Sequence, residues 1–109
     1  SAPTFASSDG GAEFLAALKQ YANYPDTPAF PHCVWSWQVG AVLDQVFQKM
    51  TSPTRDDFMK ELRSVKDYVA PLMLDGSSVN TTVDGQPAVS TVSVQKYNGK
   101  GYAPATSWE

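Results

Sequence analysis

The longest helical pattern in the sequence covers residues 31–50. Apolar residues recur there at spacings of three and four positions, at Val34, Val39, Val42, Leu43, Val46, Phe47 and Met50, and polar residues gather on the opposite side. Pro31 suits a first helical turn, because the N–H that proline lacks would have no partner in that turn. This pattern predicts the main helix of the protein.

The N-terminal half of this helix is apolar on nearly every side. It contains Trp35 and Trp37, which we interpret as core residues, with a stacking platform as the functional alternative. We therefore expect other elements to cover this half on more than one side. Gly40 costs up to about 1 kcal/mol relative to alanine inside a helix, and a close crossing of another backbone would explain it.

A shorter helix is predicted on each side of the main one. The first begins near residues 7–11, where small and polar residues can cap a helix, and it ends before Pro25. Its apolar stripe is narrow and consists of Phe14, Leu15, Leu18 and Tyr21. The other helix begins after Thr54, which caps it together with Asp57, and ends near Val69. Because only a short link joins it to the main helix, the two should pack as an antiparallel pair.

The C-terminal part of the sequence has strand character. Turns are predicted at Asp75-Gly76, Asp84-Gly85 and Asn98-Gly99. Residues 77–83 fit a short strand or an extended arm, residues 88–97 form the clearest strand, and residues 101–104 form a weak return segment. The fold class is therefore α/β, a three-helix segment followed by a β-hairpin or short strands. So few strands cannot cover an apolar helix, and we expect the chain to be incomplete.

Charge and cysteine content exclude several classes of partner. The net charge is -3, and no cluster of lysine or arginine offers a surface for nucleic acid or an anionic membrane. Cys33 is the only cysteine, so no internal disulfide forms and cysteine usage does not indicate a compartment. No apolar run reaches the roughly 18–20 residues of a membrane span, and the start shows no targeting peptide. We expect any such peptide to have been removed or never to have existed.

Several segments, in their order along the chain, resemble the C-terminal third of type I periplasmic binding proteins. These are the substrate-binding components of ABC importers in the branched-chain amino acid (leucine, isoleucine, valine) group. The segments are residues 11–21, the helix with Cys33-Val34-Trp35, residues 54–63, the turn Asp84-Gly85, and residues 92–102, which include Asn98-Gly99-Lys100-Gly101-Tyr102. The resemblance covers most of the chain and rests on the order of these segments, since no single motif is specific. Members of the family are considerably longer than this chain.

The resemblance implies a two-lobed protein that traps its ligand as the lobes hinge shut. Residues 1–109 would be a single partial domain, with 9–71 as the helical part of one lobe, 72–87 as a hinge or crossover segment, and 88–104 as the strand and hairpin of the other lobe. The implied function is binding of a small polar solute, such as an amino acid, for an ABC permease, without catalysis and without a cofactor.

The same resemblance implies a periplasmic or extracellular location, and a lipid-anchored full-length form is left open. A fragment of this kind cannot form the cleft between two lobes alone. We expect it to bury its open helix faces and its strand edge by association with further copies of itself, as a homo-oligomer.

Three residues near the start of the main helix are candidates for ligand contact. In the branched-chain amino acid binders an aromatic residue commonly sits two positions before the early tryptophan and faces the cleft. That position is Cys33 here, with His32 and Phe30 just before it. A thiol cannot cover an aliphatic side chain as tyrosine does, so the resemblance implies a larger or different solute. The alternative is that Cys33 is a small buried apolar residue.

Other interpretations of these residues are weaker. His32 could activate the Cys33 thiol as a nucleophile, but neighbours at a helix start point in different directions, and no third group orients the imidazole. One histidine and one cysteine are too few ligands for a metal site. The main alternative function is a small stand-alone domain that binds a partner protein through the helix carrying Trp35 and Trp37.

Two further motifs have simple explanations. Asp56 and Asp57 resemble a paired carboxylate, but capping and the helix dipole account for acidic residues in a first turn. Asn80-Thr81-Thr82 matches a glycosylation acceptor, which matters only in a chain secreted by a eukaryotic route.

Overall fold

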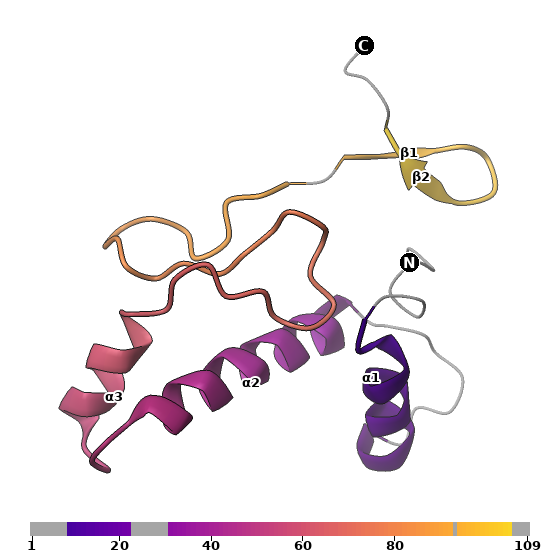
Figure 1. Ribbon diagram of the computed structural model, residues 1–109. Helices are drawn as coiled ribbons and strands as arrows, with labels where there is room; N and C mark the ends of the chain where they lie inside the picture. Colours follow the sequence, from indigo (N-terminus) through magenta and orange to yellow (C-terminus); the bar gives the residue numbers. More distant parts are fainter. Residues whose placement is uncertain (1–8, 23–30, 93, 106–109) are drawn as a thin grey trace.

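The computed structural model describes residues 9–22, 31–92 and 94–105. Its elements, in chain order, are α1 (Gly11–Ala17), the π-helical segment η2 (Leu18–Ala22), α2 (Pro31–Lys49), α3 (Arg55–Leu62), β1 (Gln95–Tyr97) and β2 (Tyr102–Pro104). Figure 1 shows α2 as the longest element, with α3 at its C-terminal end and α1 beside its N-terminal end. This is a small mixed helix and strand arrangement, compatible with the predicted α/β class.

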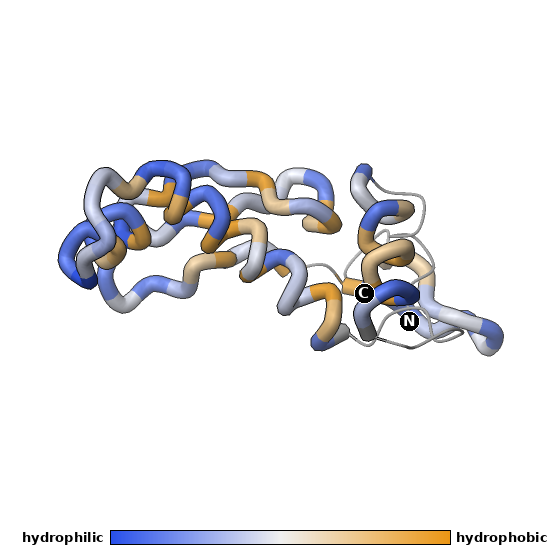
Figure 2. The backbone as a smooth tube through the Cα atoms, turned by 90° about the horizontal axis from the view of Figure 1, so that it is seen from below, coloured by the Kyte–Doolittle hydropathy of each residue, from blue (hydrophilic) through white to orange (hydrophobic). Residues whose placement is uncertain are grey.

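The molecule is elongated. Its principal extents are 52 × 39 × 19 Å, and its radius of gyration is 16.3 Å, whereas a compact chain of this length has about 13 Å. In two perpendicular views α3 and the neighbouring loops lie at one end, and α1 and the hairpin lie at the other (Figures 1 and 2). A shape of this kind leaves much apolar surface without a covering layer.

The main helix is confirmed, and one part of it forms the core. Val46 is 1% exposed and packs with Val65 and Val79, which follow α3 in the sequence. Partly buried apolar side chains surround these three: Val42, Phe58, Leu62, Tyr68 and Met73. The predicted packing of α2 with α3 is also confirmed, and the rings of Phe47 and Phe58 lie 5.7 Å apart between the two helices.

The N-terminal half of α2 does not have the predicted cover. Trp35 is 67% exposed and Val39 is 44% exposed, so the expectation that this half is buried on several sides is wrong for that face. No atom outside the helix backbone lies within 4 Å of a Cβ built on Gly40, so the expected close backbone crossing is absent among the described residues. The helix forms because of its local sequence, while the cover depends on elements that do not reach this far.

The first helix has the predicted position but a different cap. Gly10 precedes the helix with a φ of 81°, and no described side chain caps it. The predicted capping residues 7 and 8 lie outside the described residues. Phe14 is 1% exposed, whereas Tyr21, predicted on the same apolar stripe, is 80% exposed. A Cβ added to Gly10 would lie 3.5 Å from the Cβ of Pro71, so the start of α1 approaches the segment that follows α3.

The cap of α3 is confirmed, and Asp57 has an additional role. The Thr54 hydroxyl accepts a hydrogen bond from the Asp57 N–H at 3.2 Å. The Asp57 carboxylate reaches beyond the cap residue and accepts from the N–H groups of Thr51 (2.6 Å) and Ser52 (2.9 Å). One carboxylate therefore holds the link between α2 and α3.

Replacing Asp57 with asparagine should lower the melting temperature at pH 7. The backbone N–H groups of Ser52 and then Thr51 hold the pKa of Asp57 below its ordinary value of 3.8. A lowered folded-state pKa stabilises the fold above the unfolded pKa, and this stabilisation is lost as the pH falls through the folded pKa. The melting-temperature difference, measured by circular dichroism, should therefore be full at pH 7 and shrink below about pH 4.

The matched control for this prediction is Asp56→Asn. This substitution removes a charge from the same first turn of α3. It leaves the hydrogen bonds that Thr51 and Ser52 donate to Asp57 unchanged. Equal losses in both variants would show that the helix dipole, and not the link, accounts for the effect of Asp57.

The prediction that α3 continues to near Val69 is wrong, because the helix ends at Leu62. The next residues bond to a distant segment: Thr81 N–H donates to the Val65 carbonyl at 2.9 Å, and Tyr68 and Val79 exchange two backbone hydrogen bonds of 3.2 and 2.7 Å. These bonds compete with the helical pattern, and they bring Val65 and Val79 together in the core.

The Asn80 side chain links the two paired segments. Its side-chain oxygen accepts from the Asp67 N–H at 2.9 Å, and its side-chain nitrogen donates to the Ser78 hydroxyl at 3.1 Å. Asp67 has a φ of 50°, in the left-handed region that non-glycine residues rarely adopt. Both ends of the Asn80 amide are therefore engaged within the folded chain.

Ser77 is buried, and its hydroxyl has no hydrogen-bond partner among the described residues. Ser77→Ala should therefore raise the free energy of unfolding by about 1 kcal/mol, because a buried hydroxyl without a partner is destabilising. Urea denaturation measures this value. Ser78→Ala is the control and should lower it, because the Ser78 hydroxyl accepts from Asn80. A loss of stability in both variants would contradict the account of Ser77.

The C-terminal strand is shorter than predicted. The turns at Asp75-Gly76, Asp84-Gly85 and Asn98-Gly99 are present, and residues 77–83 form an extended arm with a single bridge at Val79. Among the described residues of 88–97, only Gln95–Tyr97 pair as a strand, β1, and Val92 is exposed. An isolated stretch with strand propensity needs a neighbouring strand before it becomes part of a sheet.

The predicted hairpin and its return segment are confirmed. Strands β1 and β2 pair antiparallel, with Tyr97 opposite Tyr102 and their rings 5.4 Å apart. The Asn98 side chain accepts from the N–H groups of Lys100 and Gly101, and Gly99 has a φ of 91°. The hairpin packs on none of the described helices to the extent that α2 packs on α3. Figure 1 shows it at the end of an extended segment, away from the core.

Candidate functional site

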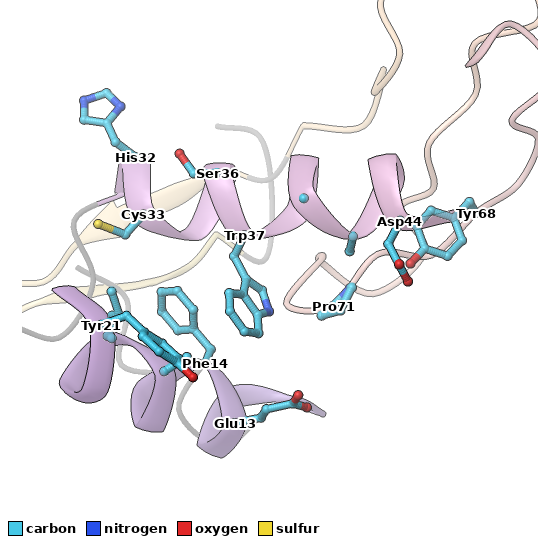
Figure 3. Close-up of a pocket in the computed structure, with 14 residues that line it drawn as sticks. Glu13, Phe14, Tyr21, His32, Cys33, Ser36, Trp37, Asp44, Tyr68 and Pro71 are labelled. Carbon is cyan, nitrogen blue, oxygen red and sulfur yellow. The ribbon is translucent and has the colours of Figure 1, made fainter. Parts of the chain in front are cut away.

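An open groove lies between α1–η2 and the N-terminal half of α2. Its volume is about 860 Å³, within the range of sites for small organic molecules. Side chains from three parts of the chain line it: α1 and η2 on one side, α2 on the other, and Tyr68 and Pro71 at one end. Figure 3 shows these side chains.

Aromatic contact forms the floor of the groove. Phe14 on α1 is buried, and its ring meets the ring of Trp37 on α2 at 5.7 Å and 63°, an edge-to-face arrangement. Pairs of this geometry are favourable beyond their buried area. Trp37 is half-buried, and its indole N–H has no acceptor among the described residues. The groove therefore has a rigid apolar base with an available donor.

Two of the three predicted ligand contacts, Cys33 and His32, line this groove. Cys33 is a half-buried free thiol, and His32 is exposed. Figure 3 shows the sulfur directed toward α1 and the imidazole directed away from it. The third, Phe30, lies outside the described residues.

The divergence of His32 and Cys33 has a chemical consequence. In the described structure no hydrogen bond joins the imidazole and the thiol, so this geometry contains no activated thiolate pair. Both residues line the groove, but the Cys33 side chain is the one directed toward α1.

The described charged residues that line the groove, apart from His32, are both acidic. Glu13 on α1 and Asp44 on α2 line it, and no lysine or arginine does among its described lining residues. Asp44 accepts from the Gln48 side chain through one oxygen, at 2.7 Å. Glu13 makes no hydrogen bond or ion pair with a described residue. Figure 3 shows both carboxylates at the end of the groove near Pro71.

The remaining candidate residues have structural roles or stand apart. Asp57 takes part in the predicted cap of α3, and it also holds the link between α2 and α3. Asn80 is half-buried with both amide atoms engaged, which leaves it poorly placed to accept a glycan. Among the described residues no three side chains of the metal-binding types lie together. Trp35 is exposed on the face of α2 away from the groove floor.

Sequence reasoning missed most of the residues that line the groove, and Glu13, Asp44, Tyr68 and Pro71 are among them. Neither Glu13 nor Asp44 was predicted from the sequence to be part of a site. Glu13 and Asp44 line the same groove because of the way α1 lies across α2, and no local pattern in the sequence specifies that packing.

No family model matches the sequence, and no curated protein or solved structure matches it either. Within the described residues, no helix is long and apolar enough to cross a lipid bilayer.

Proposed function

We propose that this chain is the C-terminal part of an extracytoplasmic solute-binding protein of an ABC importer, of the branched-chain amino acid group. In the intact protein it helps to bind a small polar solute, such as an amino acid, which a permease then receives. The order of elements supports this assignment: a first helix, a long apolar helix with an early tryptophan, a capped helix and a terminal hairpin.

The observation that carries the proposal is the half-covered face of α2. Trp35, Val39, Val42 and Val46 follow one another at spacings of four, three and four, so they form one continuous stripe. The C-terminal half of this stripe, Val42 and Val46, packs in the core, whereas Trp35 and Val39 in the N-terminal half are exposed to solvent. A stripe of this kind is expected where a further layer of a larger fold covers the same helix.

The segment after the core supports the same proposal. Residues 82–92 are exposed and lack regular structure, and they lead to a hairpin that stands away from the helices. A crossover between two lobes, followed by a strand that joins the sheet of the second lobe, requires a segment of this form. The helical part would then correspond to residues 9–71, and the crossover to residues 72–87, of which residues 79–81 also pack on the helical part.

Detection of the native protein tests the proposal. An antibody against this chain should recognise, in cells of the source organism, a species much heavier than the 11.8 kDa of the chain. It should be found in the extracytoplasmic fraction, and amino acids should raise the melting temperature of the purified species. A native species of 11.8 kDa, or one that no amino acid stabilises, would contradict the proposal.

The open stripe also leads to a prediction for the chain by itself. Light scattering across a concentration series should show a mass above 11.8 kDa at high concentration, because association covers Trp35 and Val39. Trp35→Glu should shift the series toward the monomer, whereas Tyr21→Glu, an aromatic that is 80% exposed off this stripe, should not. A monomer at every concentration would contradict this prediction.

The exposure of Trp35 favours one alternative function, a small stand-alone domain that binds a partner protein. The alternative uses Trp35 as the contact residue, because Trp37 is occupied by its packing on Phe14. A native species equal in mass to the chain, together with a partner whose binding is lost on Trp35→Ala, would favour this alternative.

A further inference from the structure

We propose that the groove between α1 and α2 binds a small organic amine in its cationic form. The ammonium group would lie at the end of the groove that Glu13 and Asp44 line, and the apolar body would lie against Trp37 and Phe14. This assignment goes beyond the proposed transport function, because the groove is formed by this chain alone and does not require a second lobe.

Charge complementarity is the first argument. Two acidic side chains from different helices line the same end of the groove, and no lysine or arginine lines it among the described residues. An anionic ligand would meet two like charges there, whereas a cation would meet two opposite charges. His32 lies at the other end of the groove and points away from α1 (Figure 3). It is therefore not placed to pair with Glu13 or Asp44.

The bonding state of the two carboxylates is the second argument. Asp44 uses one oxygen for Gln48 and keeps the other available, and Glu13 has no bond with a described residue. An ammonium group has three N–H donors and no acceptor, so it can donate to either carboxylate. Both carboxylates therefore keep at least one oxygen available for an ammonium group.

The aromatic floor is the third argument. The indole of Trp37 is the best of the natural side chains for attracting a cation to its face, and it lies in the groove between Phe14 and the acidic end (Figure 3). The edge contact with Phe14 holds the indole in place. A volume of about 860 Å³ accommodates an apolar body of moderate size beside the ammonium group.

Three probes with nearly the same apolar body separate charge from hydrophobic binding. Phenethylammonium is cationic, 2-phenylethanol is neutral and 3-phenylpropionate is anionic at pH 7. Titration calorimetry of the 109-residue chain should give the tightest binding for the ammonium and the weakest for the carboxylate. Equal affinities for the three probes, or no heat of binding with any of them, would overturn the proposal.

Variants then test whether the preference arises in the groove. Glu13→Gln and Asp44→Asn should each weaken phenethylammonium binding about two- to fivefold, the effect expected for one exposed ion pair. The double variant should bind the ammonium no better than the alcohol. Asp56→Asn lowers the same net negative charge at the start of α3, away from the groove, and should leave the affinity unchanged. An ammonium preference that survives in the double variant would overturn the proposal.

Failure here and failure of the transport proposal remain distinguishable. The native mass tests the two-lobed protein and does not depend on the ligand of this groove. The amine titration tests the groove and does not depend on the mass of the native species. Circular dichroism of each variant confirms that a lost affinity reflects the groove and not an unfolded chain.

Discussion

Val46→Asp should unfold the helical part of the protein at 25 °C. Val46 is 1% exposed and lies against Val65 and Val79 in the core. An uncompensated buried charge costs at least about 3–5 kcal/mol, and a domain of this size is stable by only about 5–15 kcal/mol in total. Far-ultraviolet circular dichroism should show the loss of most of the helical signal.

The control for this variant uses the same substitution on the same helix. Val39→Asp introduces a charge at a position that is 44% exposed, seven residues earlier on the apolar stripe. Its carboxylate remains in water, so the free energy of unfolding should change by no more than about 0.5 kcal/mol. Comparable losses in both variants would show that the N-terminal half of α2 is covered, contrary to the structure.

Phe14→Ala should release α1 from α2 while the core around Val46 stays folded. Phe14 is 1% exposed and provides the aromatic contact with Trp37. Truncation of a buried phenylalanine typically costs about 3–5 kcal/mol. Hydrogen exchange should become fast at the amides of α1 and η2, and protection in α2 near Val46 should persist because that core does not include Phe14.

Tyr21→Ala is the control for the release of α1. Tyr21 belongs to η2, which continues α1, but it is 80% exposed. Its removal should leave the exchange rates of α1 within a factor of about two of the wild type, in line with the small effects of surface substitutions. Loss of protection throughout α2 in the Phe14 variant would show that α1 and the core unfold as one unit.

The agreement between sequence and structure is greatest where residues act on their immediate neighbours. Helix α2 begins at the predicted Pro31, α3 begins after the predicted Thr54 cap, and the Asn98-Gly99 turn closes the predicted hairpin. In each case the cause lies within a few residues: a fixed proline φ, a side-chain acceptor for an orphan N–H, or a glycine with positive φ.

The disagreements arise where a distant segment competes with the local pattern. Residues 63–69 have helical spacing, but their backbone pairs with residues 79–81 and α3 ends at Leu62. Residues 88–92 have strand composition, but no neighbouring strand pairs with them among the described residues. Periodicity indicates which face could be buried, and it does not indicate which partner buries it.

The candidate site shows the same division. Cys33 and His32 were predicted from the sequence at the start of the main helix, and both line the groove. Glu13 and Asp44 were not predicted as a pair, because they lie on different helices and 31 positions apart, 44 minus 13, in the chain. The contact between Phe14 and Trp37 brings α1 and α2 together. This contact depends on side-chain packing between the two helices, which no local sequence pattern specifies.

The sequence by itself determined where helices begin, where turns occur and which faces are apolar, because proline, glycine, capping side chains and apolar spacing act over a few residues. Only the tertiary structure decided where α3 stops, which half of the α2 stripe is covered, and which side chains meet in the groove. Those outcomes depend on contacts between segments far apart in the chain, whose free energies are comparable with local preferences and can override them.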